Sequence, residues 1–255
     1  MKLLLTIALL LCSQMTVVAQ EQLTIAAAAD LQPVMKHLSA RFEKQTGSKV
    51  NLVFGSSGNF FAQLQNGAPF DLFFSADIDY PRKLEAAGLT ERGSFYEYAT
   101  GKIVLWVPSH SRVDVNKGLA AVDDPQIRRL AIANPAHAPY GRAAENALKK
   151  AGVWEQVSSR LVFGENISQT AQFANSGNAD AAILALSLVL TPAMKQQGRY
   201  SVIPPEMYPP IRQGAVIIKK SAHKTLASRF IEFLKAPETR SLFTQYGFQE
   251  PDTSQ

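Results

Sequence analysis

The sequence predicts an α/β protein in which two doubly wound lobes are joined by a hinge. Short apolar runs alternate with segments of helical periodicity from residue 22 to residue 246. This alternation is typical of parallel sheets with crossover helices. Turns rich in small and polar residues follow four of the apolar runs, and the alternation breaks twice, near residues 98–102 and 206–213.

The two breaks determine how the chain is expected to divide. If the chain crosses between lobes at both breaks, the first lobe combines residues 20–99 with residues 212–255. The second lobe is then a continuous insert of residues 100–211. Two crossing segments make a hinge, and a ligand is expected in the cleft between the lobes.

The first part of the chain carries three predicted strands and two predicted helices. The strands are apolar runs at residues 22–28, 49–54 and 71–75. Apolar side chains recur at helical spacing over residues 31–44, and Gly47 ends this helix. A second helix carries Phe61 and Leu64 and ends near residue 67.

The later part repeats the pattern after the first break. Strands are predicted at residues 101–107, 130–133, 161–163, 179–184 and 214–219. Helices are predicted at residues 141–151, after residue 166, and at 186–190, 223–235 and 237–246. Four prolines between residues 204 and 210 interrupt the pattern before the last strand.

The N-terminus predicts export from the cytoplasm to the periplasm. Lys2 is followed by an apolar run of about ten residues, and small residues lead to Ala19. The run is too short for a membrane span, which needs about 20 apolar residues. We expect a signal peptide of residues 1–19, cleaved after Ala19. Cys12 is the only cysteine, so the mature chain holds no disulfide; lipidation at Cys12 remains an alternative to cleavage.

The charge pattern argues against a nucleic-acid partner. The formal net charge is +5, and the basic residues are scattered apart from a few doublets. Nucleic-acid binders usually carry a clustered basic stripe, whereas scattered lysines and arginines indicate a solvated surface. We expect a monomer.

Four predicted turns share one design, in which a strand leads through small or polar residues into a helix. They cover residues 28–30, 55–59, 137–141 and 164–167. Each aims the backbone N–H groups of a helix N-terminus at the carboxyl edge of a sheet, where doubly wound sheets bind ligands. Helix N-termini favour anions. Two facing turns from each lobe therefore predict an uncharged cage for a small anion, selective by size and donor geometry.

Several segments resemble the periplasmic molybdate-binding proteins of ABC transporters, within the type II periplasmic-binding-protein fold. They are residues 26–31 (AAAADL), 54–60 (FGSSGNF), 66–77 (NGAPFDLFFSAD) and 233–248 at the C-terminal end. The similarity covers essentially the whole mature chain. It implies a binding protein, not an enzyme, that needs no cofactor. Its ligand would be a small oxyanion, molybdate or tungstate, and its partner the membrane permease of an ABC transporter.

The resemblance also implies which residues hold the anion. Backbone N–H groups and a few hydroxyls of the four turns would bind it, which points to Ala29, Asp30, Ser57, Tyr140 and Ile167. Ser57 aligns with a ligand-binding serine, and Ile167 with an aliphatic residue that offers its N–H. Some members have a late tyrosine in the site where this chain has Ala185; the Tyr140 phenol would then supply the missing donor.

Asp30 departs from the serine or asparagine that many members of this family carry in the first turn. A carboxylate beside a dianion repels it strongly in a dry cleft. In one interpretation, Asp30 is an N-cap that accepts the Gln32 N–H, and only its own N–H meets the ligand. In the other, the ligand carries a proton that Asp30 accepts, as hydrogen phosphate would. We favour the first, which predicts that Asp30→Asn keeps or improves molybdate affinity.

Several alternatives stay open at this stage. A hydrolase would need a pair such as Ser57 and His137, although residues 55–59 do not form a G-x-S-x-G nucleophile elbow. A cation site at Asp71, Asp77 and Asp79 is a weaker hypothesis than capping or hinge roles. Within the binding class, sulfate or phosphate is the alternative ligand. A sensor is less favoured, because no further domain is visible.

Overall fold

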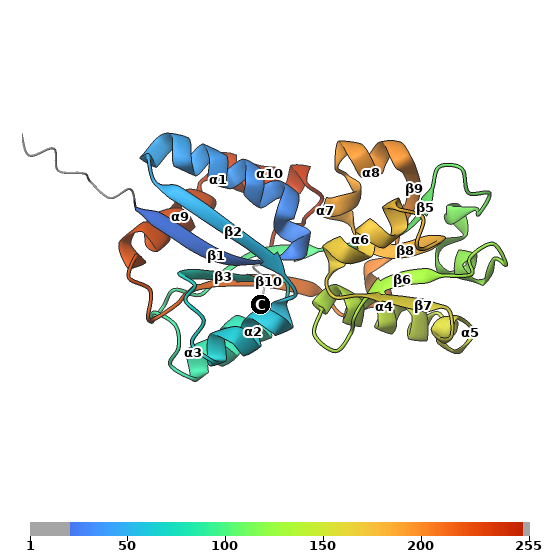
Figure 1. The fold of residues 1–255 in the computed structure, drawn as a ribbon, viewed down its shortest axis with the longest axis horizontal. Coiled ribbons are helices and arrows are strands. Elements are labelled where there is room, and N and C mark those ends of the chain that lie inside the picture. Colours follow the sequence, from blue (N-terminus) through green and yellow to red (C-terminus); the bar gives the residue numbers. More distant parts are fainter. Residues whose placement is uncertain (1–20, 252–255) are drawn as a thin grey trace, which may run out of the picture.

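The computed structural model describes residues 21–251, which form two α/β lobes side by side (Figure 1). Each lobe is built on one five-stranded sheet with helices on both faces. This arrangement confirms the predicted fold class. The predicted signal peptide and Cys12 lie outside the described residues. Within residues 21–251, no helix is both long and apolar enough to span a membrane.

The sheet of the first lobe has the strand order β2-β1-β3-β10-β4. Its strands are β1 (Gln22–Ala28), β2 (Lys49–Gly55), β3 (Leu72–Ser75), β4 (Tyr96–Gly101) and β10 (Ile211–Ile217). Strand β1 pairs in parallel with β2 and β3, whereas β10 runs antiparallel between β3 and β4. The late strand β10 therefore completes a sheet that begins at residue 22.

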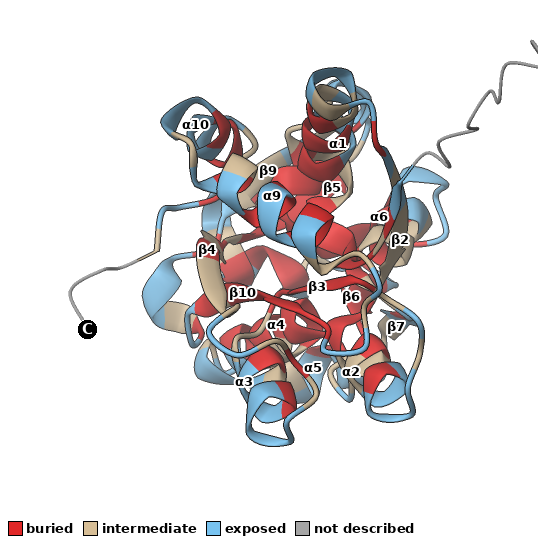
Figure 2. Ribbon diagram, turned by 90° about the vertical axis from the view of Figure 1, so that its left-hand side faces the viewer, coloured by how far each residue is buried: buried red, intermediate tan, exposed pale blue. Residues whose placement is uncertain are grey.

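Helices cover both faces of this sheet, and Figure 2 shows the buried strands between them. On one side lie α1 (Gln32–Thr46), α9 (Lys224–Lys235) and α10 (Pro237–Gln245), and on the other α2 (Ser57–Gln65) and α3 (Asp79–Ala86). A short 3-10 helix, η1 (Ala29–Leu31), connects β1 to α1. Gly47 follows α1 at φ 73°, a left-handed conformation that ends the helix as predicted.

The sheet of the second lobe has the order β7-β6-β8-β5-β9. Its strands are β5 (Ile103–Pro108), β6 (Leu130–Ala133), β7 (Leu161–Gly164), β8 (Ala181–Ala185) and β9 (Gly198–Val202). The helices are α4 (Pro139–Lys150), α5 (Trp154–Ser158), α6 (Ile167–Asn175), α7 (Leu186–Val189) and α8 (Pro192–Gln197), with 3-10 helices η2 (Val115–Asp123) and η3 (Pro205–Met207). Strand β6 is parallel to β7 and β8, whereas β5 is antiparallel to β8 and β9.

The parallel pairing expected from the sequence is present in both sheets, but each sheet also contains antiparallel strands. The strand predicted at residues 101–107 is observed as β5 from Ile103 to Pro108, whereas Gly101 is the last residue of β4 in the other sheet. Strands β4 and β9 were not predicted. Both mix polar with apolar residues, and most of their residues are only half-buried or exposed, so neither forms the continuous apolar run that marks a central strand.

An aromatic cluster fixes the outer helices of the first lobe to its sheet. The Phe42 ring of α1 meets Phe230 of α9 edge-on, with 4.9 Å between centroids. Tyr98 of β4 lies 5.4 Å from Phe74 and 5.5 Å from Phe243 of α10. Each such pair adds about 0.5–1.5 kcal/mol beyond the area it buries. The cluster therefore holds the strands whose carboxyl ends face the second lobe.

Strand β9 depends on a glycine that lies against a buried indole, and this gives a first test of the fold. A Cβ atom at Gly198 would overlap the ring of Trp106, which is 1% exposed. We expect Gly198→Ala to lower the free energy of unfolding by about 1–3 kcal/mol, as overpacked cores do. Urea denaturation measures it. The control is Val202→Thr at an exposed position of the same strand, and equal stability of both variants would contradict the packing shown.

Candidate functional site

A small cavity lies between the lobes, where the four predicted turns meet. It is lined by Ala28, Ala29, Asp30, Gly55, Ser56, Ser57, Ala76, Ala138, Pro139, Tyr140, Asn166 and Ile167. All five predicted site residues are among them, and each is at most 3% exposed. The cavity is small, with an open volume of about 10 Å³. This space suits an ion of a few atoms and excludes a sugar or an amino acid.

Three of the turns present helix N-termini to the cavity. Ser56 caps α2 by accepting the Asn59 N–H at 3.3 Å. Asn166 caps α6 by accepting the N–H groups of Ser168 and Gln169, both at 3.0 Å. The third helix, α4, begins at Pro139, whose fixed φ suits the first helical turn. The caps of α2 and α6 leave the first helical amides, those of Ser57 and Ile167, without a partner. In α4, which has no side-chain cap, Pro139 has no N–H, so the first amide is that of Tyr140.

The backbone N–H groups of Ser57, Tyr140 and Ile167, each the first amide of a helix at the cavity, have no hydrogen-bond acceptor among the described residues. The Ser57 hydroxyl accepts the Ala76 N–H at 2.9 Å, so its own proton is available to a ligand. Buried N–H groups without partners are rare and costly in folded proteins. Their convergence on one closed space indicates a site completed by an acceptor, such as the oxygens of an anion.

No lysine, arginine or histidine lines the cavity. An anion there would be held by N–H and O–H donors and by helix dipoles alone. Such a site discriminates by the size of the ligand and the direction of its oxygen lone pairs, because it has no counter-ion that attracts every anion equally.

Asp30 carries the only carboxyl side chain in the cavity wall, and it is fully buried. Its Oδ2 accepts the Tyr140 hydroxyl at 2.9 Å and the Gln213 amide at 2.7 Å. Its Oδ1 has no partner among the described residues. Burial raises the pKa of Asp30 to about 6, although both hydrogen bonds oppose the shift. The predicted capping role is wrong, because neither η1 nor α1 has a side-chain cap.

Tyr140 joins the two lobes through its hydroxyl. It belongs to α4 of the second lobe, yet it donates to Asp30 in the first, so its phenol proton is already engaged. The predicted direct donation from this phenol to an oxyanion is therefore not the contact observed. Its backbone N–H remains available. The hydroxyl fits here because Gly101, at the crossing between lobes, has no side chain; a Cβ atom would overlap it.

Gln213 and Tyr98 support this network, and neither was predicted. The Gln213 side-chain amide donates to Asp30 and, at 3.1 Å, to the Tyr140 hydroxyl, while its oxygen accepts the Tyr98 hydroxyl at 2.9 Å. Gln213 is fully buried in β10. The apolar run that defined this strand in the sequence starts one residue later, so Gln213 was excluded from it. A glutamine directly before such a run was the available signal.

Further hydrogen bonds hold the lobes together around the cavity. The Gly58 N–H donates to the His137 carbonyl at 3.0 Å, and the Asn59 amide donates to Glu165 at 2.7 Å. Ser168 donates to the Ala29 carbonyl at 2.9 Å, and Ser187 to the Asp30 carbonyl at 2.8 Å. Ser187 lies two residues after Ala185, which contributes no hydroxyl. Arg142 forms an ion pair with Asp77.

The serine–histidine pair of the hydrolase hypothesis does not form as expected. The His137 ring meets Ser56 at 3.0 Å and not Ser57. Ser56 is buried and caps α2. The cation-site hypothesis also fails, because the described residues contain no cluster of three or more His, Cys, Asp or Glu side chains suited to a metal. Asp71 instead accepts the Thr24 N–H, and Asp77 pairs with Arg142.

Two α/β lobes that meet around a cation-free cavity lined by helix N-termini define a solute-binding protein. The profile of the family described as "Bacterial extracellular solute-binding protein" matches residues 23–249, and the chain belongs to this family. It is 40% identical over 227 residues to "Molybdate-binding protein ModA" of Azotobacter vinelandii, covering 89% of each chain. It is 39% identical over 230 residues to the protein of the same name from Rhodobacter capsulatus, covering 90% of this chain and 89% of that one.

The fold is similar to a solved relative as well. The structure titled as the periplasmic molybdate-binding protein of Azotobacter vinelandii superposes with a TM-score of 0.84 at 36% identity. The match covers 90% of this chain and 100% of that one. These relatives are named as binding proteins, which confirms the prediction of a binding protein and not a hydrolase.

The raised pKa of Asp30 gives a pH-dependent stability. The unfolded chain loses this proton near its ordinary value of 3.8, and the folded protein near 6. The folded state therefore holds more protons between these values, and stability falls as pH rises through this range, by up to about 3 kcal/mol. We expect Asp30→Asn, in the closed arrangement of the lobes, to be more stable than wild type by up to that amount at pH 8, and similar at pH 4.

Urea denaturation at the two pH values measures this gap. The control is Asp79→Asn, an exposed position expected to change stability by less than about 0.5 kcal/mol at either pH. A gap for Asp30→Asn that is the same at pH 4 and pH 8 would show that the carboxyl does not titrate as described.

Proposed function

We propose that this protein captures molybdate or tungstate outside the cytoplasm and delivers it to the membrane permease of an ABC transporter. The observation that carries the proposal is the set of three free N–H groups and one free hydroxyl proton around a closed, cation-free cavity. A fully ionised tetrahedral oxyanion offers only acceptors, which matches a wall that offers mainly donors. The names of the relatives at about 40% identity support the same ligand.

In this proposal, three residues supply four hydrogen-bond donors to the anion, mainly from their backbone. Ser57 gives its N–H and its hydroxyl, and Tyr140 and Ile167 give their N–H groups. The turn at Ala29 and Asp30 closes the cavity from the remaining side. Hydrogen bonds from such donors to a charged acceptor contribute about 1.5–3 kcal/mol each. Four of them suffice to hold a small anion without a counter-ion.

Asp30 binds in its protonated form in this proposal. At about 5 Å and an effective dielectric constant of about 20, a carboxylate and a dianion repel each other by roughly 7 kcal/mol. Protonating a group whose pKa is about 6 costs about 1.4 kcal/mol at pH 7. Protonating Asp30 therefore costs much less free energy than placing its carboxylate beside the dianion. Since Tyr140 and Gln213 both donate to Oδ2, the proton sits on the unpaired Oδ1.

The two lobes are proposed to move as rigid bodies. The first lobe combines residues 20–99 with residues 212–255, and the second lobe is residues 100–211. The sheets support this division, because the chain passes between them near Lys102 and again between β9 and β10. Closure would bring Tyr140 onto Asp30 and His137 onto Gly58. The permease would then recognise the closed pair of lobes. We also propose a periplasmic location, a signal peptide of residues 1–19, and a monomer.

Calorimetric titration of the mature, ligand-stripped protein tests the ligand. We expect tight binding of molybdate and tungstate at pH 7, with sulfate and phosphate at least about a hundredfold weaker, equivalent to about 2.7 kcal/mol. Affinity for molybdate should increase in Asp30→Asn, whose amide donates where Oδ1 stands. Tight phosphate binding would instead make Asp30 an acceptor for the ligand's proton. If none of the four anions bound detectably, the proposed function would be contradicted.

Gly58 tests the proposed closure. A Cβ atom here would lie 2.6 Å from the His137 carbonyl oxygen of the opposite lobe, and backbone atoms cannot move aside cheaply. We expect Gly58→Ala to lower molybdate affinity about ten- to a hundredfold. The stability of the ligand-free protein should not fall, since alanine favours a helix more than glycine does. Titration calorimetry and urea denaturation measure both, with Gln63→Ala on the exposed face of α2 as control.

A further inference from the structure

A cavity much larger than the oxyanion site lies far from it, at the opposite edge of the first sheet. It has a volume of about 860 Å³ and is bounded by the ends of α2 and α3 and by the segment after β10. Thr24, Asp71 and Ile218 place it at the amino ends of β1 and β3, whereas the oxyanion site lies at their carboxyl ends. Its size is within the range of about 300–1,000 Å³ usual for organic ligands.

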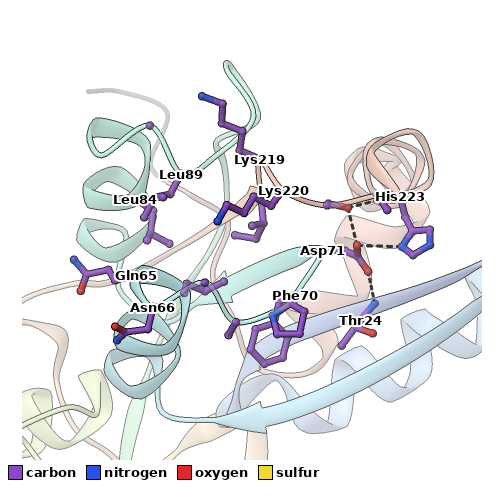
Figure 3. Close-up of a pocket in the computed structure, with 18 residues that line it drawn as sticks. Thr24, Gln65, Asn66, Phe70, Asp71, Leu84, Leu89, Lys219, Lys220 and His223 are labelled. Carbon is purple, nitrogen blue, oxygen red and sulfur yellow. Dashed lines mark hydrogen bonds and ion pairs between the residues drawn. The ribbon is translucent and has the colours of Figure 1, made fainter.

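The wall of this cavity is mostly apolar. Leu64, Leu84 and Ile218 belong to a second, smaller core of the lobe, and Phe70 and Leu89 pack against that core while remaining half-exposed. Figure 3 shows Leu84, Leu89 and Phe70 around one space. Half-exposed aromatic and aliphatic side chains around a hollow of this size are available to an apolar group of a ligand.

The charged groups at the rim are positive. Figure 3 shows the Lys220 ammonium extending toward the space between Leu84, Asn66 and Phe70, whereas Lys219 extends away from it. Neither lysine forms an ion pair with any of the described residues. The carboxyl ends of α2 and α3 are also here, but turn amides satisfy their last carbonyls: Gly67 donates to Leu64, and Leu89 to Leu84. Two full positive charges outweigh the partial charges that remain.

Asp71, the only acid in the wall, is already occupied. Its Oδ2 accepts the Thr24 N–H at 2.7 Å, and its Oδ1 accepts the Ser221 hydroxyl at 2.6 Å and contacts the His223 ring at 3.2 Å (Figure 3). These contacts fix the segment after β10 as one wall of the cavity. They also leave Asp71 little capacity to bind a cation or a ligand hydroxyl.

We propose that this cavity is a second binding site, for a small amphipathic organic acid. Its apolar body lies against Phe70, Leu84 and Leu89, and its carboxylate meets Lys220. The two sites take different ligands, since one is cation-free and holds only a few atoms while the other is apolar with a lysine at its mouth. The inference does not depend on which solute occupies the cleft.

The test uses the full mature chain and two probes that differ in one charge, 4-phenylbutyrate and 4-phenylbutan-1-ol, titrated by calorimetry. We expect saturable binding of the acid, and about tenfold weaker binding of the alcohol. Lys220→Glu should weaken binding of the acid by more than tenfold and leave the alcohol unchanged, because it replaces an attraction for the carboxylate with a repulsion. The control Lys195→Glu, on α8 of the second lobe, should alter neither.

Filling the cavity with a larger side chain is a second, independent test of the proposed site. Ala68→Trp places an indole in the cavity and should abolish binding of both probes while leaving molybdate titration and urea denaturation unchanged. If this variant does not fold, Leu89→Phe fills the same space from the opposite wall. Equal affinity for acid and alcohol would overturn the assignment of an organic acid. Unsaturable binding, or full binding by the filled variant, would overturn the site itself.

Discussion

The closed arrangement of this protein depends on one buried carboxyl group that receives donors from both lobes. Asp30 accepts Tyr140 from the second lobe and Gln213 from the late strand of the first. Tyr98 fixes the Gln213 amide from β4. A carboxyl in this position is neutral more readily than in water, because burial raises its pKa to about 6. The contact between the lobes and the electrostatics of the cavity are therefore set by the same side chain.

An anion site without a cationic side chain attracts anions less strongly but distinguishes better between them. Lysine or arginine in the cavity would bind any anion that fits, and would need strong desolvation to do so. Free amides at Ser57, Tyr140 and Ile167 are fixed by their helices, so they require no rearrangement when the ligand arrives. The basic residues of the chain lie elsewhere, and the lysine at the far cavity belongs to a different chemical environment.

Sequence patterns predicted the strands that are continuous and apolar, and the four turns that follow strands into helices. All five predicted site residues line one cavity, because turn position follows from strand order. The side-chain contacts of Asp30 and Tyr140 could not be predicted, since their partners lie 73 to 183 positions away in the sequence. Edge strands such as β9 were missed because they are only partly buried, so polar and apolar residues are mixed along them and no continuous apolar run marks the strand. Gln213 was missed because a polar residue inside a strand is read as its boundary.

The place of β10 in the first sheet has a consequence for how the chain acquires its structure. Strand β4 ends at Gly101, yet its neighbour β10 starts at Ile211, and the whole second sheet is made in between. A chain that becomes available from its N-terminus therefore exposes β3 and β4 without the strand that separates them until the second lobe has followed. The second lobe, whose strands are contiguous in sequence, can assemble first. The first lobe, which carries the Asp30 carboxyl, is necessarily completed last.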